Sequence, residues 1–313
     1  MRSRLYQQPA PATDPPPPDT QAPPAAAMRE RGPPDGPPAA LPATLAPSSA
    51  PGFSMSAQAL GTAIEQRLKQ ECEAISAALS STHDLHAAIH ATRKAVRRMR
   101  ALLALLADTA LALERTDRAL QRLGDGLSTA RDAHVVVEAA RQLQQRHPAP
   151  GWDRVIALLG ARRARILQRL QHADPGLQRR RRAIERICEG LAPLAWDAVR
   201  RQHLRHGLAR SERRVDKAAA RAMRHHEPEA IHRWRRRVRR LRMQRDVMRE
   251  LGALPGEKAG QAGDARQSRN LHKLSDQLGW KQDLRLLHAL VRAMPAHADK
   301  PALLGHIQQA MQP

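Results

Sequence analysis

Residues 89–100 read Ile-His-Ala-Thr-Arg-Lys-Ala-Val-Arg-Arg-Met-Arg, and residues 231–242 repeat the pattern as Ile-His-Arg-Trp-Arg-Arg-Arg-Val-Arg-Arg-Leu-Arg. Neither copy contains a carboxylate. On a helix that turns by about 100° per residue, His90 and the arginines three, seven and ten positions later fall within an arc of about 80°. Val96 and Met99 occupy the adjoining sector, so the basic stripe borders the buried face. A stripe in that position predicts a basic cleft between helices, and a solvated basic face is the alternative.

The segments on either side of the two copies also show helical periodicity. Apolar residues recur at helical intervals from Leu60 onward, and no window shows the sustained alternation of a strand. Pro, Gly and Ser residues separate the periodic segments. We therefore predict an all-α fold, with a loop at about 252–263 and helices at about 56–79, 84–108, 113–123, 128–146, 152–172, 177–189, 195–226, 229–251, 266–278, 283–294 and 302–311.

A second repeated segment extends the internal similarity. Residues 127–135, Leu-Ser-Thr-Ala-Arg-Asp-Ala-His-Val, resemble residues 278–286, Leu-Gly-Trp-Lys-Gln-Asp-Leu-Arg-Leu, at an offset of 151 residues instead of 142. The nine extra residues fit within the loop at 252–263. The pattern predicts two pseudo-symmetric repeats of about four helices each, at 57–190 and 191–313, which share a core and turn both basic stripes towards a central cleft.

Composition restricts the class of partner. The 313-residue chain has 53 Lys and Arg against 30 Asp and Glu, a formal net charge of +23. Residues 1–56 hold fifteen of the 24 prolines but only four basic and four acidic groups, so we expect a disordered Pro/Ala-rich segment without excess charge. The remaining residues carry the whole excess and must repel one another unless a polyanion compensates them. A polyanion is therefore the expected partner.

The cysteine pattern and the hydropathy indicate in which cellular compartment the protein is found. Cys72 and Cys188 lie far apart and form no C-x-x-C pair, so we expect small apolar fillers and neither a disulfide nor a metal site. No apolar run approaches the length of a membrane span, and no apolar segment of a secretory signal follows the N-terminus. We expect a cytoplasmic protein without membrane association, metal ion or cofactor.

The chemistry of the repeated stripe suits an anion with many oxygens. Arginine stays charged and donates two parallel hydrogen bonds to a phosphoryl group. His90 and His232 recur at the same motif position, where we expect them to contact the anion or to orient an arginine, with a packing role as the alternative. Asp132 and Asp283 are the expected orienting carboxylates, each for an arginine or histidine of its own half.

These paired His-x-x-Arg…Arg-Arg-x-Arg helices, each followed by a Leu-x-x-x-[RQ]-Asp segment, resemble the CHAD family, the conserved histidine α-helical domain. The likeness covers roughly residues 57–313. It implies two four-helix bundles around a basic channel that binds inorganic polyphosphate at polyphosphate granules, without catalysis. With a later basic helix included, the implied polyphosphate-binding residues are His90, Arg93, Lys94, Arg97, Arg98, Arg100, Arg162, Arg163, Arg165, Arg169, His232, Arg235, Arg236, Arg239, Arg240 and Arg242.

Three features depart from the family pattern. Gln282 stands where the first half has Arg131, and the last helix is short and almost free of basic residues. In many relatives a triphosphate-hydrolysing tunnel domain with the motif E-x-E-x-K precedes this module. Its nearest counterpart here, Glu71-Cys-Glu73-Ala-Ile75, lacks the lysine and falls in a predicted helix. We therefore expect a stand-alone module.

Two other function classes compete with polyphosphate binding. A sequence-independent RNA- or DNA-binding protein, or a ribosome-associated one, would also carry this charge, but the helical region has only four aromatic residues, all tryptophans. A hydrolase or kinase acting on polyphosphate would need metal-binding carboxylates, and the sequence contains no carboxylate cluster, P-loop or nucleophile elbow. We therefore expect a binding protein and not an enzyme.

Overall fold

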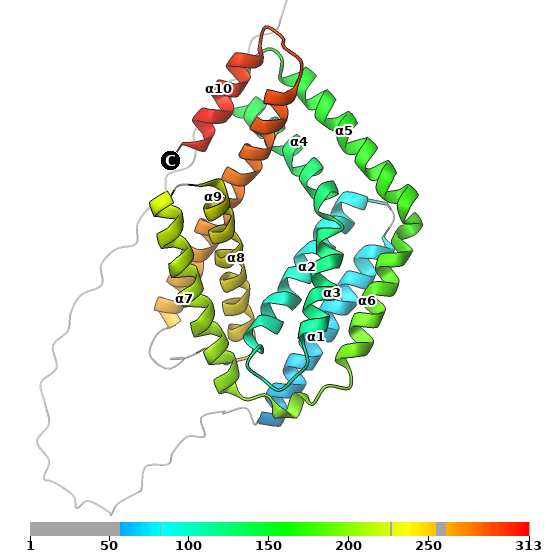
Figure 1. Ribbon diagram of the computed structural model, residues 1–313, viewed down its shortest axis with the longest axis vertical. Helices are drawn as coiled ribbons and strands as arrows, with labels where there is room; N and C mark the ends of the chain where they lie inside the picture. The colour runs from blue at the N-terminus through cyan, green and yellow to red at the C-terminus, as the bar shows by residue number, and fades with distance from the viewer. Residues whose placement is uncertain (1–56, 82, 226, 255–260, 313) are drawn as a thin grey trace, which may run out of the picture. The chain divides into compact units, whose positions relative to one another are not determined.

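The computed structural model describes residues 57–81, 83–225, 227–254 and 261–312, and the predicted Pro/Ala-rich segment lies outside these ranges. Every regular element within them is a helix, which confirms the predicted all-α fold (Figure 1). Since these residues form no strand, they contain no β-stranded tunnel domain, and none of their helices is long and apolar enough to cross a bilayer. The helices are α1 (Ala57–Ser80), α2 (Leu85–Leu105), α3 (Glu114–Asp125), α4 (Ser128–Arg146), α5 (Trp152–Ala173), α6 (Gln178–Leu191), α7 (Arg201–His225), α8 (Pro228–Glu250), α9 (Gln261–Ala293) and α10 (Lys300–Met311), with 3₁₀ turns at Pro175–Leu177 and Trp196–Ala198.

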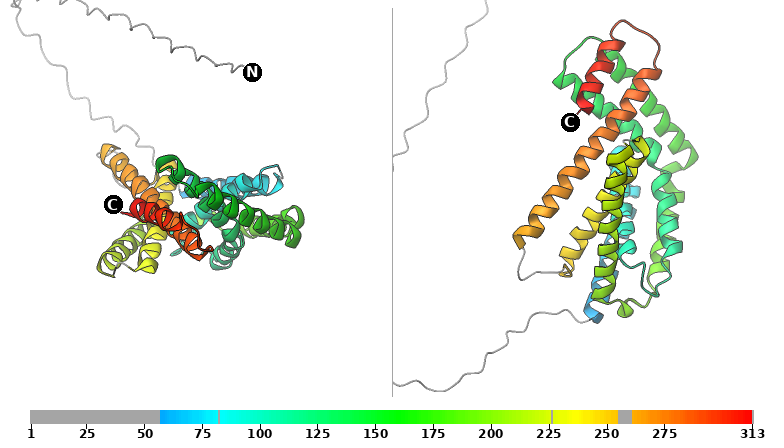
Figure 2. Two further views of the ribbon diagram at one scale, coloured as in Figure 1. Left: turned by 90° about the horizontal axis from the view of Figure 1, so that it is seen from above. Right: turned by 60° about the vertical axis from the view of Figure 1, so that its left-hand side comes forward.

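One predicted boundary fails in α9. The sequence predicts separate helices at 266–278 and 283–294, whereas α9 runs unbroken from 261 to 293 (Figure 2). Leu278 and Leu284 are both buried on this helix, so packing carries it across Gly279. A glycine costs a helix only about 1 kcal/mol, and burying a leucine contributes more than that.

A second predicted boundary fails before α7. The sequence predicts one helix at 195–226, but the chain first forms the 3₁₀ turn at Trp196–Ala198. The Trp196 indole Nε1 donates to Leu191 O at 3.1 Å, and the Trp196 backbone lies so close to Gly61 of α1 that no Cβ would fit between them. These contacts hold the turn in place and delay the start of α7.

Two large hydrophobic cores and a small third cluster around Ile89 and Leu127 hold the described helices together. The larger of the two cores is formed by α1, α2, α3, α6, α7 and α8, around residues such as Ile64 and Met248. The smaller joins α4 and α5 to α9 and α10 around Trp152 and Leu287, in the upper part of Figure 1. Each core therefore takes helices from both halves of the sequence. The division into two repeats at residue 190 stays a prediction.

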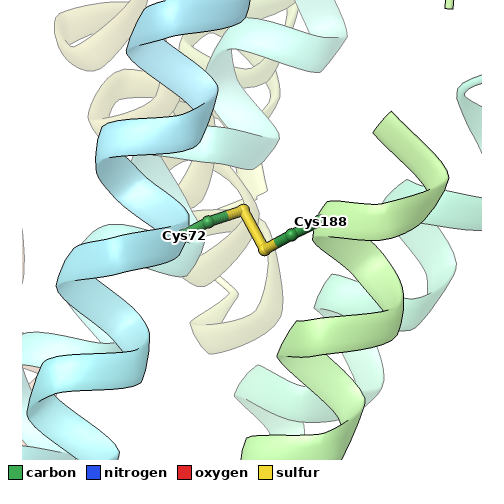
Figure 3. The surroundings of a disulfide bond; sticks show 2 residues. All are labelled: Cys72 and Cys188. Atoms are coloured by element: carbon green, nitrogen blue, oxygen red, sulfur yellow. A yellow bond between two sulfur atoms is a disulfide. The ribbon is translucent and has the colours of Figure 1, made fainter. Parts of the chain in front are cut away.

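The two cysteines form a disulfide bond between α1 and α6 (Figure 3). The Cα atoms of Cys72 and Cys188 lie 6.3 Å apart, within the range that a disulfide can span. The prediction of two unpaired apolar cysteines is therefore wrong. The cysteines are 116 positions apart in the sequence, and they meet only because α1 and α6 pack together. The argument for a reducing compartment, which rested on unpaired thiols, loses its basis.

Candidate anion-binding site

A cavity of about 370 Å³ lies between α2, α3, α4, α8 and α9. Both basic stripes contribute to its wall, so the structure brings the two halves of the predicted site together. Eight arginines line the cavity against two aspartates, Asp125 and Asp132. Its basic lining residues are Arg93, Arg97, Arg100, Arg131, His232, Arg235, Arg236, Arg239 and Arg240.

The junction between α3 and α4 positions the arginines of α2. Arg93 donates through Nη1 to Gly124 O and, at 2.8 Å, to Ser128 Oγ. Its Nε is buried and has no hydrogen-bond partner among the described residues. Arg97 donates from Nε to Arg93 O at 3.0 Å, one helical turn earlier. Backbone and hydroxyl groups thus fix both arginine side chains, and only the charges of Asp132 and Asp125 act against the positive charge of Arg93.

Arg235 occupies the most enclosed position of the second stripe. The residue is 5% exposed, and its Nε and Nη2 find no hydrogen-bond partner in the part of the chain that the structure describes. Burial lowers the pKa of Arg235, while the nearby Asp283 acts in the opposite direction and Arg131 adds repulsion. A buried guanidinium with free N–H groups is unfavourable unless an acceptor meets them. Arg235 is therefore poised to donate to an anion in the cavity.

Like charges lie close together at the centre of the cavity. Loss of hydration, followed by the charges of neighbouring arginines, lowers the pKa of Arg97 to about 10 and that of Arg239 to about 9. The charge of Arg97 is among the causes that lower the pKa of Arg239. Both remain cations at neutral pH. The cavity therefore holds like-charge repulsion that a bound polyanion would relieve.

The two predicted orienting carboxylates meet at a single arginine. Arg131 Nη1 of α4 lies 3.1 Å from Asp132 Oδ1 and 3.1 Å from Asp283 Oδ1 of α9, and Arg131 Nη2 lies 3.4 Å from Asp283 Oδ2. Asp283 forms this ion pair with an arginine of the other half, because α4 and α9 pack together, while its charge also acts on Arg235 of its own half. This pair fixes α4 to α9 at the cavity wall.

The two motif histidines occupy different positions. His232 lines the cavity and hydrogen-bonds Gln282, whereas His90 and Lys94 are exposed and lie outside the lining. Partial burial lowers the pKa of both histidines, and neighbouring cations add to the effect, with Arg97 acting on His90. Both are therefore neutral at pH 7 in the ligand-free protein.

Two arginines of the first stripe already hold carboxylates. Arg98 clamps Glu71 of α1, with Nε–Oε1 and Nη2–Oε2 distances of 2.6 Å, and Glu71 is 2% exposed. Arg98 does not line the cavity, so it ties α2 to α1 and is no anion ligand there. Arg100 lines the cavity but pairs with Asp117 at 2.7 and 2.9 Å, which compensates much of its charge.

The arginines assigned from the later basic helix lie on α5, which does not line the cavity. Arg163 Nη1 approaches Glu138 Oε1 of α4 at 3.9 Å. Arg242 also lies outside the lining, with its Nη1 3.7 Å from Asp276 Oδ1. Its charge is nevertheless among the causes that lower the pKa of Arg97 and Arg239. The short α10 packs into the smaller core and contributes nothing to the wall. The α5 residues outside the cavity are Arg162, Arg163, Arg165 and Arg169.

Sequence reasoning missed several lining residues. Arg131 had a signal, since it precedes Asp132 in the repeated Leu-x-x-x-[RQ]-Asp segment. Gln282 occupies the matching place in the second half. Gly124 and Ser128 accept hydrogen bonds from Arg93. The sequence carried no signal for either residue, because a junction between helices has no periodic pattern.

Comparison with known proteins agrees with this architecture. The CHAD domain model matches residues 58–292. The crystal structure of the CHAD domain from the plant Ricinus communis is similar with a TM-score of 0.60 and 24% identity, over 86% of this chain and 93% of that one. PptA from Streptomyces chartreusis is similar with a TM-score of 0.55 and 17% identity, over 80% of this chain and 97% of that one. No curated protein matches the sequence. Because the family match spans most of its length, the chain belongs to the CHAD domain family.

Proposed function

We propose that this protein binds linear inorganic polyphosphate in the central cavity. The observation that carries the proposal is the convergence of eight arginines, against two aspartates, on one space of about 370 Å³. Each phosphate of such a polymer offers oxygens that accept charge-assisted hydrogen bonds. Buried N–H groups of Arg93 and Arg235 lack partners among the described residues and can donate those bonds.

Binding without catalysis fits the carboxylates near the cavity. Asp132 and Asp283 both contact Arg131, and Asp117 holds Arg100. Within the described ranges no group of three His, Cys, Asp or Glu side chains could hold a metal ion, which phosphoryl transfer ordinarily requires. Sustained phosphate release from polyphosphate in the presence of Mg²⁺ would contradict this part of the proposal.

Nucleic acid is the competing polyanion. Among the described residues no Trp, Tyr or Phe lines the cavity, and Trp152 and Trp196 are buried in the cores, so the large aromatic rings on which bases usually stack are missing from this lining. RNA or DNA could then bind only through its backbone, whose phosphates are more widely spaced than those of polyphosphate.

A competition assay separates these two ligands. Long-chain polyphosphate and RNA compete in a gel shift with the full chain at about 150 mM salt, where weak phosphate contacts are screened. We expect polyphosphate to displace RNA at equal phosphate concentration, and displacement in the other direction would overturn the proposal. The double variant Arg97→Glu/Arg239→Glu should lose binding while its helical circular dichroism persists. Retained binding would place the ligand elsewhere.

We further propose that the bound polymer recruits the protein to polyphosphate granules in the cytoplasm. Fluorescence microscopy of a tagged full chain tests this, with the same double variant as its control. A diffuse signal of the wild-type protein in cells that contain granules would contradict it.

A further inference from the structure

A second cavity adjoins the central one at His232. It has a volume of about 420 Å³ and lies beside α8 and α9. Four residues line both cavities, so the two spaces are direct neighbours that share a wall. These shared residues are His232, Arg236, Gln282 and Leu286.

The second cavity is cationic in its own right. Arg233 and Arg285 line it in addition to the shared Arg236, and Glu229 is the one carboxylate in its described lining. Arg285 Nη1 is buried and has no hydrogen-bond partner in the described part of the chain. Arg233 is exposed at the rim. The cavity thus offers one enclosed and one solvent-facing guanidinium beyond the central site.

The shared wall differs between the two halves of the protein. In the first half Arg131 is engaged by Asp132 and Asp283, whereas the matching residue of the second half is the uncharged Gln282, which hydrogen-bonds His232. Position 282 therefore brings no second cation to Asp283 at the wall that the two cavities share. Gln282 can also donate to an anion that passes it.

We infer that the second cavity is a phosphate-binding site onto which a long polyphosphate chain extends as it leaves the central cavity. The inference rests on the proposed function. A short anion is held by the central arginines alone, whereas a long polymer also reaches Arg233 and Arg285. The two cavities then select ligands by chain length, since one covalent chain occupies both and the second contact is intramolecular.

The test compares two probes, tripolyphosphate and long-chain polyphosphate, on the variant Arg233→Gln/Arg285→Gln. The matched control is Arg205→Gln/Arg213→Gln, which removes the same charge from exposed positions of α7 outside both cavities. We expect the site variant to bind the long chain about tenfold to a hundredfold more weakly and tripolyphosphate within about twofold of wild type. The salt dependence of long-chain binding should also become shallower, by about 0.7 in slope for each phosphate that the variant no longer binds.

The outcomes distinguish the two proposals. Equal weakening for both probes, or equal weakening in the site and control variants, would overturn the second site and leave the central one standing. If wild-type protein binds neither probe, the polyphosphate function itself fails. Circular dichroism checks the fold of each variant, and Arg233→Gln alone, a change at an exposed position, should reproduce part of the long-chain effect.

Discussion

Arg239→Gln should stabilise the ligand-free protein while it weakens polyphosphate binding. The pKa of Arg239 falls to about 9, far below the ordinary value of an arginine, so the folded state disfavours the charged form that prevails at pH 7. At about 1.4 kcal/mol for each tenfold change in the acid constant, the full difference is roughly 5 kcal/mol. Screening by water and small anions in an open cavity reduces the net gain to about 1–2 kcal/mol.

Thermal and chemical unfolding measure this gain. For a domain of this size the Tm should rise by roughly 2–8 °C, whereas Arg205→Gln, on the exposed face of α7, should stay within about 0.5 kcal/mol of wild type. With polyphosphate added, the wild type should have the higher Tm, because the ligand stabilises the wild type more than the Arg239→Gln variant. A variant that is less stable than wild type without ligand would refute the repulsion argument and make Arg239 a structural residue.

Three further outcomes follow from other interactions. Reducing the disulfide should lower the free energy of unfolding by about 4–5 kcal/mol, because it closes a loop across 116 residues; equal denaturation midpoints with and without reductant would contradict this. Lowering the pH from about 7.5 to 5.5 should tighten polyphosphate binding, since the depressed pKa of His232, which lines the cavity, rises when an anion binds. The same depression removes ligand-free stability as the pH falls below 6.5. Replacing His232 by glutamine should flatten that binding profile in a titration, whereas the same change at His90, outside the lining, should not. Arg98→Gln should cost about 1–3 kcal/mol in urea denaturation, because it removes two charge-assisted hydrogen bonds from the buried Glu71 and leaves it the ion pair with Arg67. An affinity loss beyond about twofold would mean that Arg98 contacts the ligand.

Hydrophobic periodicity was sufficient to predict the all-α fold and the convergence of the two stripes, but not the bounds of α7 and α9. Arg97 and Arg239 occupy equivalent motif positions beside the apolar face of α2 and α8, and a stripe bordering a core has to face a neighbouring helix. The same reasoning fails for Arg98, one residue further along. A rotation of about 100° turns its side chain towards Glu71 of α1, and no local pattern connects Arg98 to a carboxylate on another helix.

Interactions between distant segments account for the other errors. The disulfide depends on the packing of α1 against α6, and the pairing of Asp283 with Arg131 depends on α4 meeting α9. Neither neighbour can be inferred from spacing along the chain. The α5 arginines were assigned from a family pattern, and the structure packs α5 against α4, outside the cavity wall.

Because each core contains helices from both halves of the sequence, neither half can be removed without exposing parts of both cores. A fragment ending near residue 190 would carry α1, α2, α3 and α6 without the α7 and α8 surfaces that cover them, and α4 and α5 without α9 and α10. Each fragment would expose apolar surface on two separate faces and could bury it only by meeting its complement. The larger core therefore needs the chain as far as α8, and the smaller one needs it as far as α10, so a translating ribosome must release almost the entire chain before the smaller core can close.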